Sequence, residues 1–259
     1  MMVLKLGGSV VTKKDAPMTA DEGNIRRLAE EIAAAEPRKL VVVHGGGSFG
    51  HPVAKRYGIA EGFISHPQVP GFSKTHRAMV ELSSLIVDAL LDVAVSAVSV
   101  APSSFIVTDE GRIGAVELDI VRRLVDLGII PVLYGDAVLD RSRGFSILSG
   151  DQIAVRLAVD LDASRLLFGV DVDGVYTSNP KLDPEARLIE RLPLDRLRGL
   201  VEIGGASTID VTGGMLGKVS EAAVAVEAGV DVHIVNASKP TIILKALRGE
   251  PVRGTILTR

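Results

Sequence analysis

Hydrophobic and polar positions along this chain follow two periods. Short apolar runs, typical of strands buried on both faces, occupy residues 40–43, 97–100, 130–134, 165–170 and 232–235. Between them, apolar residues recur at intervals of three and four, which predicts helices at residues 22–35, 75–93, 151–161 and 216–228. This alternation predicts an α/β fold with a mainly parallel sheet and helices on both faces.

Two glycine-rich segments fall where ligands bind in such folds. A first strand at residues 2–6 ends in Gly7-Gly8-Ser9, and the strand at 40–43 runs into the glycines of residues 45–50. Ligands of parallel sheets lie beyond the carboxyl ends of the strands. Residues 106–115 and 136–147 are short alternating runs broken by Gly, Asp and Arg, and they predict two hairpins.

The segment VVVHGGGSFGH, residues 41–51, is the most informative part of the chain. Glycine lets the backbone approach a ligand closely, and the start of the following helix offers unpaired N–H groups. Together they predict an anion site, most often for phosphate, with a tight structural turn as the alternative. His51 stands at the end of the segment, where its side chain can point at the anion.

Two standard phosphate motifs match this segment only in part. Residues 45–50 fit the dinucleotide pattern GxGxxG, but no Asp or Glu lies between residues 62 and 80 to bind a ribose. The same glycines begin a P-loop, but His51-Pro52 stands where Lys-Ser/Thr is required. We interpret the segment as a phosphate loop with histidine in place of the P-loop lysine. Pro52 is expected at an early helix position.

Lys5 is a cation within the first apolar strand. An exposed lysine on an edge strand is the alternative, but the neighbouring glycine loops favour a lysine that faces phosphate. Lys13 and Lys14 follow shortly afterwards, and we interpret Lys13 as a surface charge.

The second half of the chain holds three further candidate clusters. Ser149-Gly150-Asp151 opens a helix, and helix capping by Ser149 is the alternative to a binding role. The acidic turn at residues 169–176 lacks the ligands of a calcium loop, so we expect Asp171 to accept from a ribose or base, with Tyr176 stacking nearby. Lys218 is expected in the first turn of its helix, off the apolar stripe. A cation there opposes the helix dipole, which suggests an anionic partner such as ATP phosphate.

Composition excludes several classes of protein. The net charge of −3 gives no general attraction to nucleic acid or membranes, so neither is expected as a partner. The absence of cysteine excludes disulfides, thiolate catalysis and Cys-zinc sites. No signal peptide is visible and no apolar stretch reads as a membrane span, and we expect a cytoplasmic protein.

Five motifs, in order along the whole chain, resemble the amino acid kinase superfamily. They are KLGGS at residues 5–9, HGGG at 44–47, SGD at 149–151, DVDGVY at 171–176 and TGGMLGK at 212–218. The resemblance implies one domain, residues 1–259, with a three-layer α/β/α sandwich and a mainly parallel central sheet. Residues 1–148 would form the acceptor-binding half and residues 149–259 the nucleotide-binding half.

Lys14 and GSFGHP at residues 47–52 resemble the branch of this superfamily that phosphorylates isopentenyl phosphate with ATP. The resemblance implies that Lys5 and Lys218 hold ATP phosphates, Lys14 stabilises the transition state, Asp151 orients the lysines and His51 binds the acceptor phosphate. It further implies substrate binding by Gly46, Gly47, Gly50, Ser149 and Gly150, and ATP binding by Gly7, Gly8, Ser9, Gly47, Asp171, Tyr176, Thr177, Lys181 and Gly214. Mg²⁺ would be held through ATP phosphates and water, with no metal ligands from the protein.

The resemblance also implies a pocket for the isoprenyl tail, a lid and an assembly. Met79, Ser83 and Ile86 are candidates for the tail pocket, although core packing explains Met79 and Ile86 equally well. Residues 58–74 are expected to form a lid. A homodimer is expected because superfamily members commonly pair, and because Met79, Ile86 and Leu90 widen the apolar face of the helix at 75–93.

Two alternatives remain open at this point. One is another kinase of the superfamily, acting on a nucleotide monophosphate or a small phosphonate. The other is a non-catalytic nucleotide-binding protein of the same fold, against which the combination of Lys5, Lys14, His51 and Lys218 argues.

Overall fold

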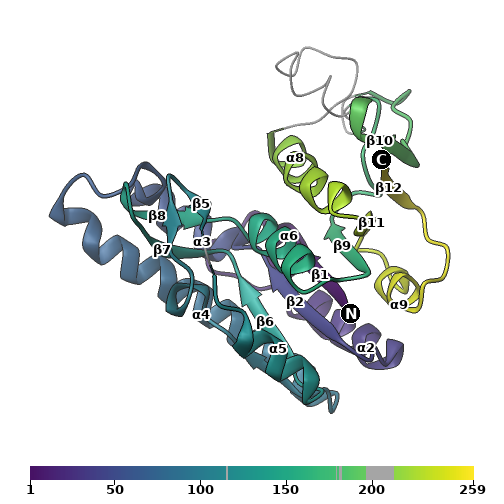
Figure 1. Ribbon diagram of the computed structural model, residues 1–259, viewed down its shortest axis with the longest axis horizontal. Coiled ribbons are helices and arrows are strands. Elements are labelled where there is room, and N and C mark those ends of the chain that lie inside the picture. The colour runs from purple at the N-terminus through teal and green to yellow at the C-terminus, as the bar shows by residue number, and fades with distance from the viewer. Residues whose placement is uncertain (115, 179, 181–182, 197–212) are drawn as a thin grey trace.

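The computed structural model describes residues 1–114, 116–178, 180, 183–196 and 213–259. The described strands of the main sheet run in the order β10-β12-β11-β9-β1-β2-β6-β3, and of these neighbours only β11 and β12 are antiparallel. The strands are β1 Met2–Leu6, β2 Leu40–His44, β3 Ala97–Ser99, β6 Ile130–Tyr134, β9 Arg165–Val170, β10 Arg191–Pro193, β11 Asp231–Asn236 and β12 Gly254–Thr258. The predicted mainly parallel sheet is confirmed (Figure 1).

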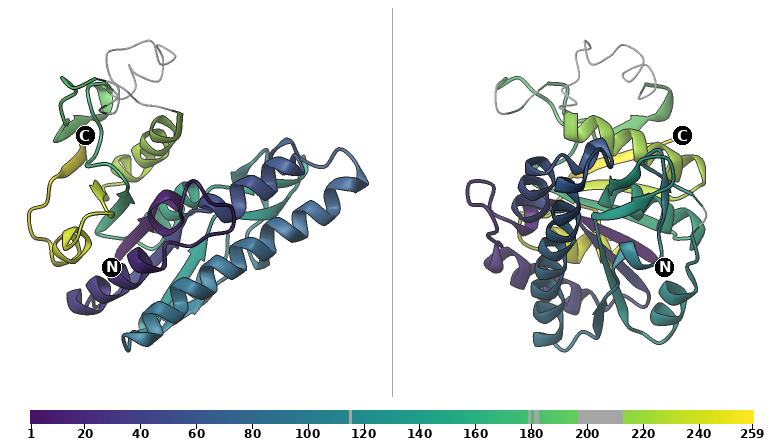
Figure 2. Two further views of the ribbon diagram at one scale, coloured as in Figure 1. Left: turned by 180° about the vertical axis from the view of Figure 1, so that it is seen from behind. Right: turned by 90° about the vertical axis from the view of Figure 1, so that its left-hand side faces the viewer.

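Helices cover both faces of this sheet, as Figure 2 shows. One face packs against α2 Glu22–Ala35, α4 Val69–Asp92 and α9 Ile242–Arg248, and the other against α5 Asp119–Asp126, α6 Gly150–Asp160 and α8 Gly213–Glu227. Within β1, Leu4 and Leu6 belong to the first core and Val3 to the second, because successive side chains of a strand point to opposite faces. The expected three-layer sandwich is confirmed.

A smaller sheet stands beyond the carboxyl end of β6. Its strands run in the order β5-β4-β7-β8, with bounds β4 Thr108–Asp109, β5 Arg112–Ile113, β7 Asp136–Asp140 and β8 Gly144–Leu148. Both predicted hairpins are therefore confirmed, and they join through the pairing of Thr108 with Asp140. Two short helices, α1 Gly8–Val11 and α3 Gly47–Arg56, follow the glycine loops.

Residues 58–74, expected to form a lid, hold two 3-10 helices, η1 Ile59–Glu61 and η2 His66–Gln68, and the start of α4. The buried amide of Gln68 accepts from the N–H groups of Ile64 and Ser65 and donates to the carbonyls of Gly58 and Gly62. A third 3-10 helix, η3 Pro102–Ser104, follows β3. Because Pro70 is tolerated in a first helical turn, α4 begins six residues before the predicted start.

Several elements depend on contacts that no local pattern reveals. The sequence analysis did not predict α5, α9, β10 or β12. Helix α9 starts where the Glu31 carboxylate of α2 accepts from the N–H groups of Thr241 (2.8 Å) and Leu244 (3.0 Å). Within the described residues, no helix is both long and apolar enough to cross a membrane.

Candidate active site

A large pocket lies at the carboxyl end of the sheet, with a volume of about 1070 Å³. This slightly exceeds the volume of about 300–1,000 Å³ that is typical of a site for one drug-sized ligand. Fifteen of the predicted site residues line it: Lys5, Gly7, Gly8, Ser9, Lys14, Gly46, Gly47, Gly50, His51, Ser149, Gly150, Asp151, Asp171, Tyr176 and Lys218. The pocket therefore gathers segments from both halves of the chain and has room for two small ligands.

Three residues predicted to contact the nucleotide are not among the residues that line the pocket. Thr177 is not among the lining residues, because its N–H donates to the Arg187 carbonyl and its hydroxyl accepts from the Arg187 N–H. Lys181 lies outside the described residues. Gly214 belongs to the first turn of α8 and is not among the lining residues. Met215 and Lys218 are the residues of α8 that line the pocket.

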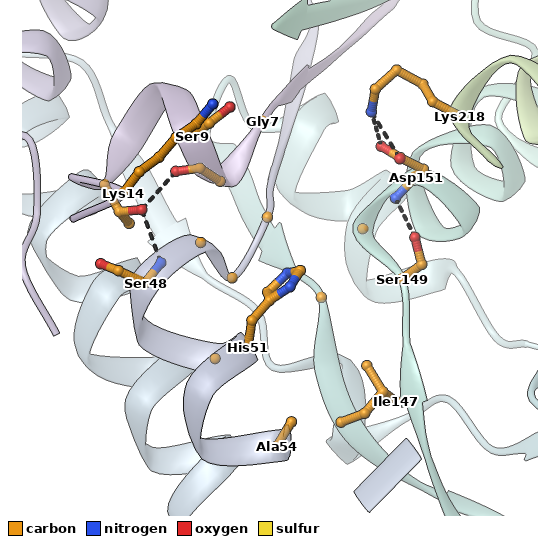
Figure 3. Close-up of a pocket in the computed structure, with 18 of the residues that line it drawn as sticks. Gly7, Ser9, Lys14, Ser48, His51, Ala54, Ile147, Ser149, Asp151 and Lys218 are labelled. Atoms are coloured by element: carbon orange, nitrogen blue, oxygen red, sulfur yellow. Dashed lines mark hydrogen bonds and ion pairs between the residues drawn. The ribbon is translucent and has the colours of Figure 1, made fainter. Parts of the chain in front are cut away.

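Two ammonium groups share one carboxylate at the nucleotide end of the pocket. Lys5 of β1 lies 2.7 Å from Asp151 Oδ1. Lys218 of α8 lies 2.8 Å from each oxygen of Asp151, as Figure 3 shows. Both lysine side chains are buried. Because the cluster carries one positive charge in excess, it is suited to bind an anion.

The environment of this cluster sets its protonation. Burial opposes the ionisation of Asp151, but Lys5 and Lys218 outweigh it and lower the pKa of the carboxyl. Burial and the nearby Lys5 lower the pKa of Lys218 to about 8, against the opposing effect of Asp151. Lys218 stands in the second turn of α8 because the helix begins at Gly213, so its placement in the first turn was wrong. The charge of Lys218 is balanced by Asp151, so its main electrostatic partner is this carboxylate and not the dipole of α8.

The two glycine loops pack backbone against backbone. A Cβ atom on Gly8 would lie 2.3 Å from Gly47 N, and one on Gly47, whose φ is +46°, would lie 2.1 Å from Thr12 Oγ1. Among the described residues, no acceptor takes the N–H groups of Gly46 and Gly47. Glycine at residues 8 and 47 thus lets the loops touch, and the loop of residues 45–47 keeps two free donors for an anion.

His51 projects from α3 into the middle of the pocket, across from the Ser149–Asp151 segment (Figure 3). Burial and the positive charge of Lys5 lower its pKa below the ordinary value, so the ring is neutral at pH 7 and donates from one nitrogen. Pro52 occupies the sixth residue of α3, so the expectation of an early helix position was wrong. The Ser48 carbonyl, which has no N–H partner at Pro52, accepts from Met18 N–H at 3.0 Å.

Lys14 and Asp171 form an ion pair with Nζ 2.6 Å from Oδ2. Burial raises the pKa of Asp171, but the hydrogen bond and charge of Lys14, with smaller contributions from Ser9 and a backbone N–H, lower it, and the net shift is downward. More than half of the Lys14 side chain is exposed, so this pair can open. Lys13 is exposed and does not line the pocket, in agreement with its interpretation as a surface charge.

Ser149 caps α6, because its hydroxyl accepts from the Asp151 N–H at 3.1 Å. The capping alternative is therefore confirmed for Ser149. Its position beside Gly150 also leaves it in the pocket wall.

The far end of the pocket is apolar. Ala54 of α3 and Ile147 of β8 lie there, away from the lysines (Figure 3), and Met79 of α4 also lines the wall. Ser83 and Ile86 do not line it, so two of the three tail-pocket candidates were wrong. One and two turns further along α4, Ser83 bonds Ser99 at 2.8 Å and Ile86 is packed in the core.

Sequence reasoning missed Asp136, which lines the pocket directly beyond β6. Its carboxylate is buried and faces His76 Nδ1 at 3.0 Å. Burial raises the pKa of Asp136, although His76 acts in the opposite direction. An acidic residue immediately after a predicted parallel strand was the available signal.

Known proteins resemble this chain over most of its length. The sequence pattern of the Amino acid kinase family matches residues 1–236. The chain belongs to the amino acid kinase family. A family member named isopentenyl phosphate kinase, from Methanothermobacter thermautotrophicus, is 43% identical over 100% of this chain and 99% of its own length.

Other members of the amino acid kinase family show the same relationship. The Arabidopsis thaliana isopentenyl phosphate kinase is 37% identical over 84% of this chain and 70% of its own length. A crystal structure of an isopentenyl phosphate kinase superposes with a TM-score of 0.88 at 41% identity, covering the whole of both chains. The Thermoplasma acidophilum enzyme, in a product complex, gives a TM-score of 0.81 at 30% identity over 99% of each chain.

The lowered pKa of Lys218 predicts an alkaline limit to ATP binding. The ammonium form binds phosphate, so affinity should hold near neutral pH and fall by up to about tenfold per pH unit above a pKa of about 8. In Lys218→Arg the cation stays protonated, so this decline should disappear. Calorimetric titration of ATP between about pH 7.5 and pH 9.5 measures both, with Lys13→Ala as a control that should keep the decline. A wild-type affinity that does not change with pH would contradict the assignment.

Proposed function

We propose that this chain transfers the γ-phosphoryl group of ATP to isopentenyl phosphate, giving isopentenyl diphosphate and ADP for isoprenoid biosynthesis. The observation that carries the proposal is one continuous pocket with two lysines on Asp151 at one end, His51 in the middle and an apolar wall at the other. Full-length relatives named isopentenyl phosphate kinase support it.

The reaction needs positioning and charge neutralisation more than covalent help from the protein. An oxygen of the acceptor phosphate attacks the γ-phosphorus, the bond to the β–γ bridging oxygen breaks, and ADP leaves with that oxygen. Two anions must therefore meet, and cations must face the transferring group. Lys5 and Lys218 are proposed to hold the ATP phosphates while Asp151 keeps both ammonium groups in place.

Lys14 is proposed to stabilise the transition state. Its pairing with Asp171 means that the ammonium group has to leave or share that carboxylate as the nucleotide binds. Its exposure makes this movement inexpensive, because exposed ion pairs contribute little stability. Asp171 is then free to accept from the ribose or base, as expected from the sequence.

The remaining nucleotide contacts are proposed from the same half of the pocket. The loop Gly7-Gly8-Ser9 would face the phosphates and Tyr176 the nucleoside. Thr177, Lys181 and Gly214 stay predictions, since Thr177 and Gly214 are not among the lining residues and Lys181 lies outside the described residues.

The acceptor is proposed to bind at the middle and far end of the pocket. His51 donates to its phosphate from one ring nitrogen, together with the free N–H groups of Gly46 and Gly47; Gly50, Ser149 and Gly150 complete the wall around it. The isopentenyl chain would lie on Met79, Ala54 and Ile147. The division into an acceptor half, residues 1–148, and a nucleotide half, residues 149–259, stays a prediction.

Mg²⁺ is proposed to travel with ATP. Within the described part of the chain, no three His, Asp or Glu side chains gather closely enough to hold a metal ion. The pocket residues fit an ion bound mainly by phosphate oxygens and water, the arrangement that Mg²⁺ prefers. Such an ion would neutralise part of the phosphate charge. A cytoplasmic location and the lack of nucleic-acid or membrane partners stay predictions.

Acceptor specificity tests this proposal. Isopentenyl phosphate should be phosphorylated in the presence of ATP and Mg²⁺, whereas uridine monophosphate and acetylglutamate should be much poorer acceptors, because both would place polar groups on the apolar wall. A coupled assay of ADP release measures all three. Equal or better turnover of either alternative would assign the chain to another branch of the family, and no turnover with any acceptor would favour a non-catalytic nucleotide-binding protein.

Removal of the His51 ring should weaken the transition state. His51→Ala is expected to lower kcat/KM. The loss should correspond to about 2–4 kcal/mol of transition-state stabilisation, the range for losing one preorganised donor. His51→Gln should keep part of the activity, because an amide also donates. His66→Ala is a matched control in an exposed 3-10 helix outside the pocket. If His51→Ala keeps a kcat/KM near that of the wild type, His51 does not act on the substrate and serves only as a residue of α3.

The homodimer also stays a proposal, with altered support. Met79, Ile86 and Leu90 are buried in the core of this chain, so the argument from a wide apolar face of α4 was wrong for these residues. Leu91 on the outer face of the same helix is 52% exposed and offers a self-contact. Light scattering should give about twice the chain mass of 27.3 kDa, and a mass equal to that of one chain would contradict the dimer.

A further inference from the structure

The β4–β5 hairpin contacts α6, the helix that carries Asp151. Gln152 directly follows Asp151, and its side chain is buried. Its Oε1 accepts from the Ile113 N–H at 2.7 Å, and its Nε2 donates to the Gly111 carbonyl at 3.2 Å. The tip of the hairpin is therefore fixed to α6 at the position next to the shared carboxylate.

The same hairpin also contacts α8 through an ion pair. Arg112 places both terminal nitrogens on Glu221, with Nη2 3.0 Å from Oε2 and Nη1 on Oε1. Glu221 stands one helical turn after Lys218 on α8, so the hairpin contacts the same helix that supplies the ammonium group. A two-point contact of guanidinium with carboxylate fixes orientation as well as distance.

The hairpin is also anchored to β7 in the acceptor half, at Gly111 in its turn and at Thr108 at the start of β4. The buried carboxylate of Asp140, in β7, accepts from the Gly111 N–H at 2.7 Å and from the Thr108 hydroxyl at 2.7 Å. Gly111 is therefore held by Asp140 through its N–H and by Gln152 through its carbonyl, so the hairpin forms an arm between β7 and α6. It reaches from the acceptor half to the outer side of both helices that carry the anion-binding cluster.

This arm matters because the cluster itself changes partner when a nucleotide binds. Among the residues that the structure describes, Asp151 is the carboxylate paired with both Lys218 and Lys5. When phosphate arrives, each ammonium group divides its hydrogen bonds between Asp151 and the ligand, so the link between α8 and α6 through Lys218 weakens. The contact between Arg112 and Glu221 lies outside the pocket and involves no ligand.

We propose that Arg112 is a positioning residue for nucleotide binding, which holds Glu221 and so keeps α8 docked with Lys218 facing the ATP phosphates. The proposal rests on the proposed function, since it takes ATP as the ligand of Lys218. The alternative is an ordinary surface ion pair with no effect on the pocket, which is common for exposed residues. Arg112 is itself largely exposed, whereas Glu221 is mostly covered.

The two readings predict different binding constants. Arg112→Ala and Glu221→Ala should each weaken the binding of a non-hydrolysable ATP analogue by about three- to tenfold, the size expected for a two-point charged pair. The KM for isopentenyl phosphate at saturating ATP should change by less than about twofold, because the acceptor touches neither α8 nor Arg112. Arg112→Lys should keep part of the affinity, since it retains the charge but not the fork.

Calorimetry on the full chain tests this with a double-mutant cycle. The double variant Arg112→Ala/Glu221→Ala should bind no more weakly than either single variant, and the reversed pair Arg112→Glu/Glu221→Arg should recover most of the affinity. Arg123→Ala, which removes an exposed pair with Asp119 on α5, is the matched control and should bind as the wild type does. Thermal unfolding checks that each variant is folded.

The outcomes separate the two proposals. A wild-type chain that does not bind the analogue would overturn the proposed function and with it this inference. Normal wild-type binding with unchanged affinity in folded Arg112→Ala and Arg112→Lys would overturn only the inference. Equal loss of affinity for the analogue and for the acceptor, or additive effects of the two single variants, would also overturn it, because both indicate general destabilisation.

Discussion

The sharing of one carboxylate by two buried lysines is the constraint on which the site depends. Lys5 comes from a strand, Asp151 from the start of one helix and Lys218 from another, so the cluster exists only when β1, α6 and α8 are all in place. Two buried cations would be strongly unfavourable without Asp151 between them. Their surplus positive charge is equally unfavourable without an anion nearby, and this is why the unliganded site is prepared for phosphate.

The glycine loops serve this cluster by bringing strands together. Gly8 and Gly47 touch because neither carries a side chain, and this contact aligns the loops after β1 and β2 at one edge of the sheet. Thr12 ties the loops, since its hydroxyl donates to the Gly8 carbonyl and accepts from the Ser48 N–H. The sequence analysis interpreted Gly8 and Gly47 as ligand-binding residues. They are needed first for the two loops to pack against each other.

The sequence predicted the framework well because its signals are local. Buried parallel strands and amphipathic helices have distinct periods, and glycine after a strand marks the ligand edge. What escaped prediction depends on distant partners. Asp136 faces His76 from another element, the pairing of Lys14 with Asp171 spans most of the chain, and α9 is capped by Glu31. Ser83 and Ile86 were misplaced because helical spacing gives a face but not how far along it the pocket extends.

The position of β1 has a consequence for how the chain folds during synthesis. β1 pairs with β2 on one side and with β9 on the other, so Met2 lies opposite both Leu40 and Arg165. The first pairing is available early, whereas the second must wait until residues beyond 170 have left the ribosome. Parallel pairing between segments so far apart in sequence forms slowly. Until then the edge of β1 that will pair with β9 is open to other chains.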